Sequence, residues 1–168
     1  PGSKLFPYIQ KNLDDIITIE DDELVVAFLD MVENHKMVVE NSGLLTVAAL
    51  KHLNVKDKRV VSILSGGNMD VITMSSVVQQ GLIFRDRIFT VSVLLPDKPG
   101  ELCRVSGVIA KENGNVIKLE HNQFVSTNRS VAVELRITLE AFGTDHKHQI
   151  MEALEREGYQ PKLVRTQI

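Results

Sequence analysis

The most regular pattern of apolar and polar residues lies in the second half of the chain. Apolar residues alternate with polar ones along two stretches, Phe89, Val91, Val93 and Leu95 in the first and Val131, Val133, Leu135, Ile137 and Leu139 in the second. A period of two is typical of β-strands that bury one face. The pattern therefore predicts two long strands of a sheet with one apolar and one polar face.

The segments around these strands complete a recognisable order of elements. We expect helices at about 100–112 and 144–157, and further strands at 115–121 and 159–165. The order β-α-β-β-α-β over residues 86–168 is the ferredoxin-like plan. The apolar helix residues expected to cover one sheet face are Leu102, Val105, Ile109, Ile150, Ala153 and Leu154. The opposite face, which can tolerate water, carries Thr90, Ser92, Lys118, Glu120, Glu134 and Arg136.

The first 84 residues predict a different organisation, a partial α/β layer. Apolar, β-branched runs at 15–20 and 59–64 favour strands. A helix begins at Asp21 and Asp22, with Leu24, Phe28, Met31 and His35 on one face. Ser42 is the expected N-cap of a second helix with Leu45, Ala49 and Leu53 on one face, and a third helix runs from about 70 to 80. Two strands are too few to cover these helices, so we expect this part to be a segment of a larger sheet domain.

Composition excludes several classes of function. The net charge is −3 and no basic stripe is present, which argues against nucleic acid as a partner. The longest apolar runs are too short to cross a membrane, and no signal peptide is apparent. The single Cys103 is typical of a reducing compartment, so we expect a cytoplasmic protein. His146 and His148 lie two apart on a helix and point in different directions, so we expect no metal site.

The turn between the first strand and the first helix of residues 86–168 is the strongest functional signal. The sequence LPDKPGEL covers Leu95 to Leu102, and GNV covers Gly114 to Val116. Together with the β-α-β-β-α-β order, these motifs resemble the ACT domain, a small regulatory module that binds amino acids. The resemblance implies an effector site, across a dimer interface, formed by Asp97, Lys98, Pro99, Gly100, Glu101, Leu102, Asn115 and Val116.

The chemistry of these residues agrees with such a site. Pro99 is expected at the first helical position, and Gly100 permits a close backbone approach. The free N–H groups at the start of the helix can receive a carboxylate, while Asp97 and Asn115 can meet an ammonium group. The alternative is that Asp-Lys-Pro-Gly forms an ordinary turn and that the domain only dimerises.

A second resemblance covers residues 1–84. GLLTVAALKHL and RVVSILSGGNMDV resemble the end of the catalytic domain of the threonine dehydratase and serine racemase group, which are pyridoxal-phosphate enzymes of fold type II. The resemblance implies that Ser65 bonds the pyridine nitrogen of the cofactor, with Gly66, Gly67 and Asn68 beside it and Glu40 near its ring. The run NSGLLT at 41–46 is bulkier than the small-residue run of that group. The structural alternative is a strand end that turns into a helix, capped by Asn68 or Asp70.

The order of the two resemblances implies the C-terminal part of a single-ACT threonine ammonia-lyase, which converts threonine to 2-oxobutanoate and ammonium. We expect an ACT homodimer that binds isoleucine or valine. No Ser-Phe-Lys-like segment or tetraglycine loop is present, and residue 1 is Pro, so we expect an inactive fragment that binds no pyridoxal phosphate without the missing catalytic part. The alternative is a stand-alone module that senses amino acids or dimerises.

Overall fold

The computed structural model describes residues 2–122 and 133–166 of the chain. It divides into two compact units, residues 1–74 and residues 75–168, and each unit is considered by itself. The sequence-based boundary near residue 85 remains a prediction, and helix α4 (Val71–Phe84) crosses the division that the structure shows.

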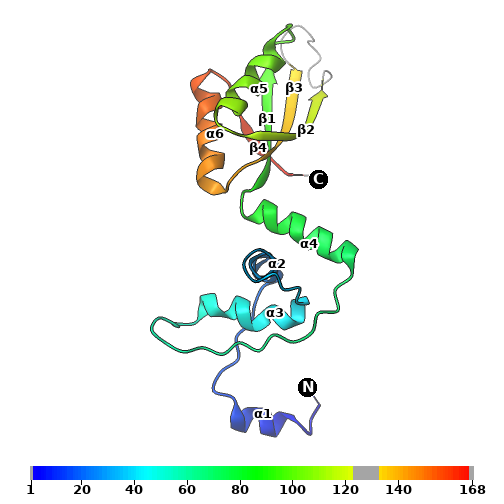
Figure 1. Cartoon of the computed structure of the whole chain (residues 1–168), viewed down its shortest axis with the longest axis vertical. Helices are drawn as coiled ribbons and strands as arrows, with labels where there is room; N and C mark the ends of the chain where they lie inside the picture. Colours follow the sequence, from blue (N-terminus) through cyan, green and yellow to red (C-terminus); the bar gives the residue numbers. More distant parts are fainter. Residues whose placement is uncertain (1, 123–132, 167–168) are drawn as a thin grey trace. The chain divides into compact units, whose positions relative to one another are not determined.

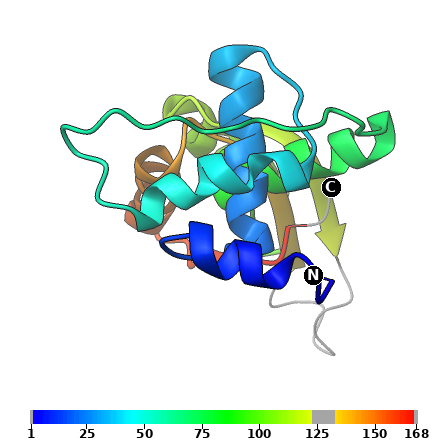
Figure 2. The same cartoon turned by 90° about the horizontal axis from the view of Figure 1, so that it is seen from below.

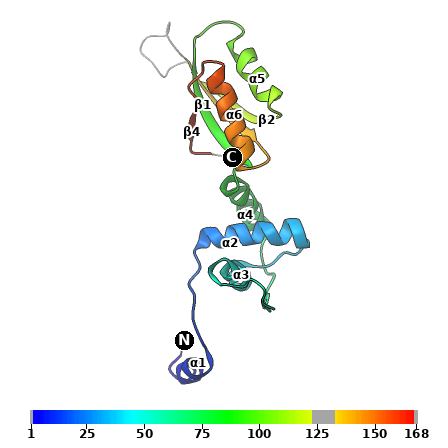
Figure 3. The same cartoon turned by 90° about the vertical axis from the view of Figure 1, so that its left-hand side faces the viewer.

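The second unit contains an antiparallel four-stranded sheet in the order β2-β3-β1-β4 (Figure 1). Its strands are β1 (Ile88–Leu95), β2 (Asn115–Asn122), β3 (Val133–Glu140) and β4 (Lys162–Val164). Its helices α5 (Glu101–Lys111) and α6 (Thr144–Arg156) lie beside each other on one face of the sheet (Figures 1 and 3). The ferredoxin-like prediction is confirmed, with strand position 131 lying outside the described residues.

The core of this unit lies between the sheet and the two helices, as the alternating pattern predicts. Val91, Val93, Leu135 and Ile137 are fully buried on the helix-facing side, where they pack against the apolar residues of α5 and α6. The predicted core position of Leu102 is wrong, because the buried cluster begins one turn later at Val105 and leaves Leu102 46% exposed.

The first unit is helical in its described part. It consists of α1 (Phe6–Asn12), α2 (Asp21–Asp30) with a π-helical turn at Met31–His35, and α3 (Asn41–Ala48) with a 3₁₀ turn at Ala49–His52. Helices α2 and α3 contact each other and cross (Figure 2). Leu24, Phe28 and Met31 are buried as expected, whereas His35 is exposed.

Three predictions for this unit are wrong. The runs 15–20 and 59–64 form no strand, since neither pairs with another strand among the described residues and an unpaired segment cannot build a ladder. Glu40, not Ser42, is the N-cap of α3. The buried face of α3 therefore shifts to Gly43, Leu44 and Ala48, leaving Leu45 and Leu53 more than 40% exposed.

None of the helices in the described part of the chain combines the length and apolar character that a membrane crossing requires.

Candidate effector site and candidate cofactor segment

The loop from β1 to α5 presents backbone donors at the start of a helix. Gly100 adopts a left-handed conformation with φ of 93°, which costs glycine little and other residues more. The Lys98 N–H donates to the Pro96 carbonyl over 2.8 Å and closes a tight turn. Helix α5 begins at Glu101, so the predicted helical position of Pro99 is wrong, because the left-handed Gly100 separates Pro99 from the helix.

The first turn of α5 keeps donors available for a ligand. The Arg104 N–H donates back to the Gly100 carbonyl over 3.0 Å. The Glu101 N–H donates to the Lys98 carbonyl over 3.4 Å. The N–H groups of Leu102 and Cys103 belong to the first turn of the helix, whose donors have no partner inside the helix. Asp97, Lys98, Pro99, Gly100 and Leu102 are all exposed. The loop can thus offer positive potential and free donors to a carboxylate.

Asn115 begins β2 and is held by a residue that the sequence motif did not reveal. The Asn115 side-chain amide donates to Glu140 Oε2 over 3.1 Å, and the two residues face each other across β2 and β3. This bond leaves the Asn115 side-chain oxygen free to accept from an ammonium group. Glu140 has no motif of its own and is found only through the strand register.

Gly114 allows β2 to start close to the helices. A Cβ atom there would lie 2.8 Å from Ile109 Cγ2 and 3.0 Å from Ile150 Cδ1. Only glycine permits this approach without displacing a side chain of the core. The glycine of the GNV motif therefore has a packing role, beside the exposed Asn115 and Val116.

The two halves of the predicted effector site lie at opposite ends of the sheet in one chain. Asn115 is in register with Glu140 and, through it, with Ile88 at the start of β1. The loop that carries Asp97 and Gly100 follows Leu95, at the other end of β1. Ile88 and Leu95 are seven residues apart along the extended strand, so the level of Asn115 and the level of the loop are separated by roughly 23 Å. A single subunit therefore does not bring the loop and Asn115 to one ligand.

The candidate cofactor segment packs closely against the start of α3. A Cβ atom on Gly43 would lie 1.9 Å from the Ser65 carbonyl oxygen, and one on Gly66 would lie 2.5 Å from Glu40 Oε1. The Glu40 N–H donates to the Gly66 carbonyl over 3.3 Å. The structure thus brings together Ser65, Gly66 and Glu40, and adds Gly43 as the residue that permits their approach. Their roles toward a cofactor stay a prediction.

The side chains of this segment differ in what they bind. The Ser42 hydroxyl donates to Glu40 Oε1 over 2.6 Å. Ser65, Gly67 and Asn68 are exposed. Asn68 does not cap α4, because Asp70 Oδ1 accepts the N–H groups of Ile72 and Thr73 over 3.0 and 2.9 Å. Bonds from the Thr73 hydroxyl and these N–H groups lower the pKa of Asp70.

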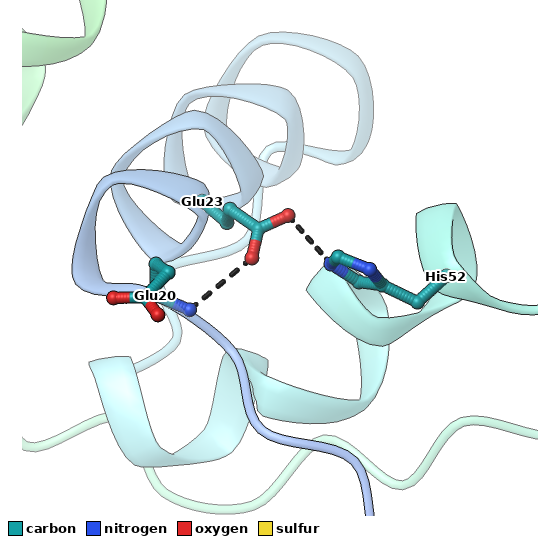
Figure 4. A network of polar contacts seen from close by, with 3 residues as sticks. All are labelled: Glu20, Glu23 and His52. Atoms are coloured by element: carbon teal, nitrogen blue, oxygen red, sulfur yellow. Dashed lines mark hydrogen bonds and ion pairs between the residues drawn. The ribbon is translucent and has the colours of Figure 1, made fainter.

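A polar network ties the start of α2 to the 3₁₀ turn that follows α3 in the first unit (Figure 4). Glu23 accepts the Glu20 N–H at Oε2 over 3.1 Å and contacts His52 Nε2 through Oε1 over 2.7 Å (Figure 4). The bond from the Glu20 backbone, followed by that from His52, lowers the pKa of the Glu23 carboxyl. The network explains the acidic start of α2 as a structural cap and offers no ligand site.

Asp86 joins the end of α4 to the start of α6 within the second unit. It occupies a left-handed position with φ of 54° and accepts bonds from Thr144 Oγ1 over 2.8 Å and Lys147 Nζ over 2.6 Å. Burial raises the pKa of this carboxyl, but the bonds from Lys147 and Thr144 outweigh burial and lower it. The carboxylate form therefore stabilises the junction of α4 with the sheet domain.

We expect Asp86→Asn to remove most of the acid sensitivity of this junction. A group whose pKa is lower in the folded state stabilises the fold above its unfolded pKa and loses that contribution as the pH falls through the folded pKa. Urea unfolding at pH 7 should show a loss of stability in the variant, and the difference from the parent chain should shrink below about pH 4. Asparagine tolerates the left-handed backbone, so the substitution tests the charge and not the backbone conformation. A difference in stability between the parent chain and the variant that is unchanged at low pH would contradict the role of the charge.

Comparison with known proteins finds a family match in the second unit and similarity to relatives over nearly the whole chain. Residues 89–158 match the family model described as the ACT domain. The chain is 34% identical over 161 residues to L-threonine ammonia-lyase from Geobacter sulfurreducens, covering 95% of this chain and 40% of that protein. It is 30% identical over 165 residues to L-threonine ammonia-lyase from Thermotoga maritima, covering 98% of this chain and 41% of that protein.

The chain thus spans about 40% of the length of these relatives. Among solved structures, the ACT domain of prephenate dehydrogenase tyrA from Bacillus anthracis is 23% identical, with a TM-score of 0.35, over 44% of this chain and 99% of that one.

Proposed function

We propose that this chain is the regulatory C-terminal part of a pyridoxal-phosphate-dependent threonine ammonia-lyase, and that its ACT domain binds isoleucine or valine across a homodimer. The similarity to proteins named L-threonine ammonia-lyase supports this, because it extends over both units and not over the ACT domain alone. In the parent enzyme, threonine would be converted to 2-oxobutanoate and ammonium.

The observation that carries the effector proposal is the separation of the two half-sites. Asn122 is in register with Glu134 and, through it, with Leu94, so β2 ends at the level where the effector loop begins. Strand β2 is an edge strand, with an unpaired row of backbone groups. A two-fold axis that pairs β2 with β2 of a second copy makes these strands antiparallel. Asn115 of one copy then lies at the level of Asp97 and Gly100 of the other.

Such a shared site has groups for each part of a branched-chain amino acid. The N–H groups of α5 and the left-handed Gly100 receive the carboxylate. Asp97 and the side-chain oxygen of Asn115 receive the ammonium group, beside the Glu140 carboxylate. The apolar side chains of Leu102 and Val116 are 46% and 36% exposed and offer contact to an aliphatic side chain.

The residues of the candidate cofactor segment suit pyridoxal phosphate bound in the full-length parent. When bound, this group withdraws electrons from the α-carbon of the amino acid. Ser65 is exposed, and among the described residues its hydroxyl has no partner, so it is available to hold the pyridine nitrogen by a neutral hydrogen bond. A neutral partner favours elimination over transamination. Glu40, held by Ser42, would line the same side.

The remainder of the catalytic domain is the proposed partner of the first unit. Val61 and Ile63 are 90% and 72% exposed on the unpaired segment 59–64, and Ile72 is 81% exposed. Apolar side chains exposed in such a group mark surfaces that a partner covers. The exposed thiol of Cys103 suits the reducing cytoplasm, where we place the protein.

Calorimetric titration of this chain with isoleucine and valine tests the proposal. We expect saturable binding that weakens at least tenfold in Asp97→Ala and in Asn115→Ala, since each loses a bond to a charged group worth about 1.5–3 kcal/mol. Lys111→Ala, at the far end of α5, is the matched control and should bind as the parent does. A folded dimer that binds neither amino acid would contradict the effector function and favour a module that only dimerises.

A further inference from the structure

The helix-free face of the ACT sheet holds a cavity that the effector proposal does not use. Lys118, Thr138, Thr90 and Val164 form one row across all four strands. The cavity over this row has a volume of about 260 Å³. Besides these four residues, its lining consists of Glu120, Arg136 and Arg165. The sequence had indicated only that this face tolerates water.

The floor of the cavity carries one hydrogen-bond donor that is not used within it. Thr90 and Thr138 are 6% and 4% exposed, and their hydroxyl oxygens lie 2.9 Å apart in a mutual hydrogen bond. Two hydroxyl groups carry two protons, and their mutual bond uses one of them. The second proton needs an acceptor outside the pair, because a buried donor without an acceptor lowers the stability of the fold.

The walls of the cavity are mainly cationic. Lys118, Arg136 and Arg165 carry positive charge, against one carboxylate, Glu120, in the same lining. Lys118 pairs with Glu120 over 2.9 Å, whereas Arg165 has no ionic partner among residues 2–122 and 133–166. The chain as a whole has a net charge of −3, so this concentration of cations runs against its overall charge.

Arg136 is oriented by a carboxylate that does not line the cavity. Its Nε donates to Glu134 Oε2 over 3.1 Å, which leaves the terminal NH₂ groups of the guanidinium for another acceptor. Glu134 also accepts the Ser92 hydroxyl over 2.6 Å and the Asn122 amide over 3.4 Å. The bond from Ser92, with those from Arg136 and Asn122, lowers the pKa of Glu134 and keeps it ionised. The guanidinium is thereby fixed before a ligand arrives.

We propose that this cavity binds a small carboxylate, as a second ligand site of the domain, separate from the effector loop. The carboxylate accepts from Arg136, Arg165 and the free threonine hydroxyl proton, a combination of planar and charge-assisted bonds that suits carboxylates. Glu120 in the lining disfavours a doubly charged anion such as phosphate. The cavity, at about 260 Å³, lies just below the range of about 300–1,000 Å³ that is usual for drug-sized ligands, so it suits a small carboxylate.

The test is a titration of the ¹⁵N-labelled chain with sodium propionate, followed by the amide signals of Thr90 and Thr138. We expect saturable shifts that sodium chloride at equal ionic strength does not produce. Arg165→Gln should weaken binding about tenfold or more, from the loss of a charge-assisted bond. Arg165 is exposed, so its replacement leaves the fold intact. Thr138→Val should weaken binding likewise.

Lys162→Gln is the matched control. Lys162 begins β4, the strand that Arg165 directly follows, and is in register with Ser92. It does not line the cavity, so this variant should bind as the parent does. Shifts that chloride reproduces, or that survive both Arg165→Gln and Thr138→Val, would overturn the proposal. Saturation by sodium phosphate but not by propionate would overturn the assignment to a carboxylate. Shifts at Gly100 and Leu102 report on the effector loop and separate the two sites.

Discussion

Gly43→Ala is expected to lower the free energy of unfolding of the first unit by roughly 3 kcal/mol, the upper end of the usual cost of overpacking. The added Cβ atom would lie 1.9 Å from the Ser65 carbonyl oxygen and 2.8 Å from Val39 Cγ1. A backbone oxygen cannot rotate away as the end of a side chain can. The segment that carries Ser65 must therefore move off α3, and the hydrogen bond from Thr46 to the Ile63 carbonyl would be strained with it.

Hydrogen exchange of the α3 amides measures this effect without interference from the second unit. Gly67→Ala is the matched control, since its Cβ atom would meet only the Val38 carbonyl, at 3.2 Å. We expect much smaller changes in that variant. Equal protection of α3 in the parent and in Gly43→Ala would contradict the close packing of the candidate cofactor segment on this helix.

If the proposed dimer forms through β2, Leu119→Lys is expected to convert it to a monomer at tens of micromolar chain. Leu119 lies on the edge strand β2, is 38% exposed and faces the helix side through its register with Ile137. In a dimer that pairs β2 with β2, a lysine on each copy brings two like charges together in an apolar contact, and lysine on an edge strand is a common barrier to strand pairing. Sedimentation velocity measures the change.

Leu163→Lys is the control for this prediction. Leu163 is 53% exposed on β4, the opposite edge of the same sheet. The substitution introduces the same charge at a similar edge position, and we expect the dimer to persist. Dissociation by Leu163→Lys, with a stable dimer in Leu119→Lys, would show that the copies pair through β4 and that the proposed shared site does not form.

The sequence predicted the ferredoxin-like fold well because each of its elements has a local signal. The alternation of Phe89 to Leu95 and of Val133 to Leu139 depends only on one buried sheet face, and this face is buried. The glycine of the GNV motif marks a close approach that only the structure explains. Leu102 failed as a core residue because helical periodicity does not show where the packed layer ends.

The first unit was harder to predict because its segments depend on tertiary partners. The run 59–64 has the composition of a buried strand, but a strand also requires a paired neighbour, and the described residues supply none. The cap of α3 was displaced by two residues because glutamate is an uncommon N-cap and Ser42 a favoured one. The contact of Glu140 with Asn115 was not predicted, because it follows from the register of β2 and β3 and not from a local motif.

The measurement that tests the shared effector site most directly is a mixing experiment with two variants that are each expected to bind isoleucine or valine at least tenfold more weakly than the parent. In a dimer of Asp97→Ala with Asn115→Ala, one of the two sites combines the intact loop of one copy with the intact Asn115 of the other. After subunit exchange at equal concentrations, half of the dimers are mixed, and we expect about a quarter of the parental binding capacity at parental affinity. No recovery of binding in verified mixed dimers would contradict a site built from both copies.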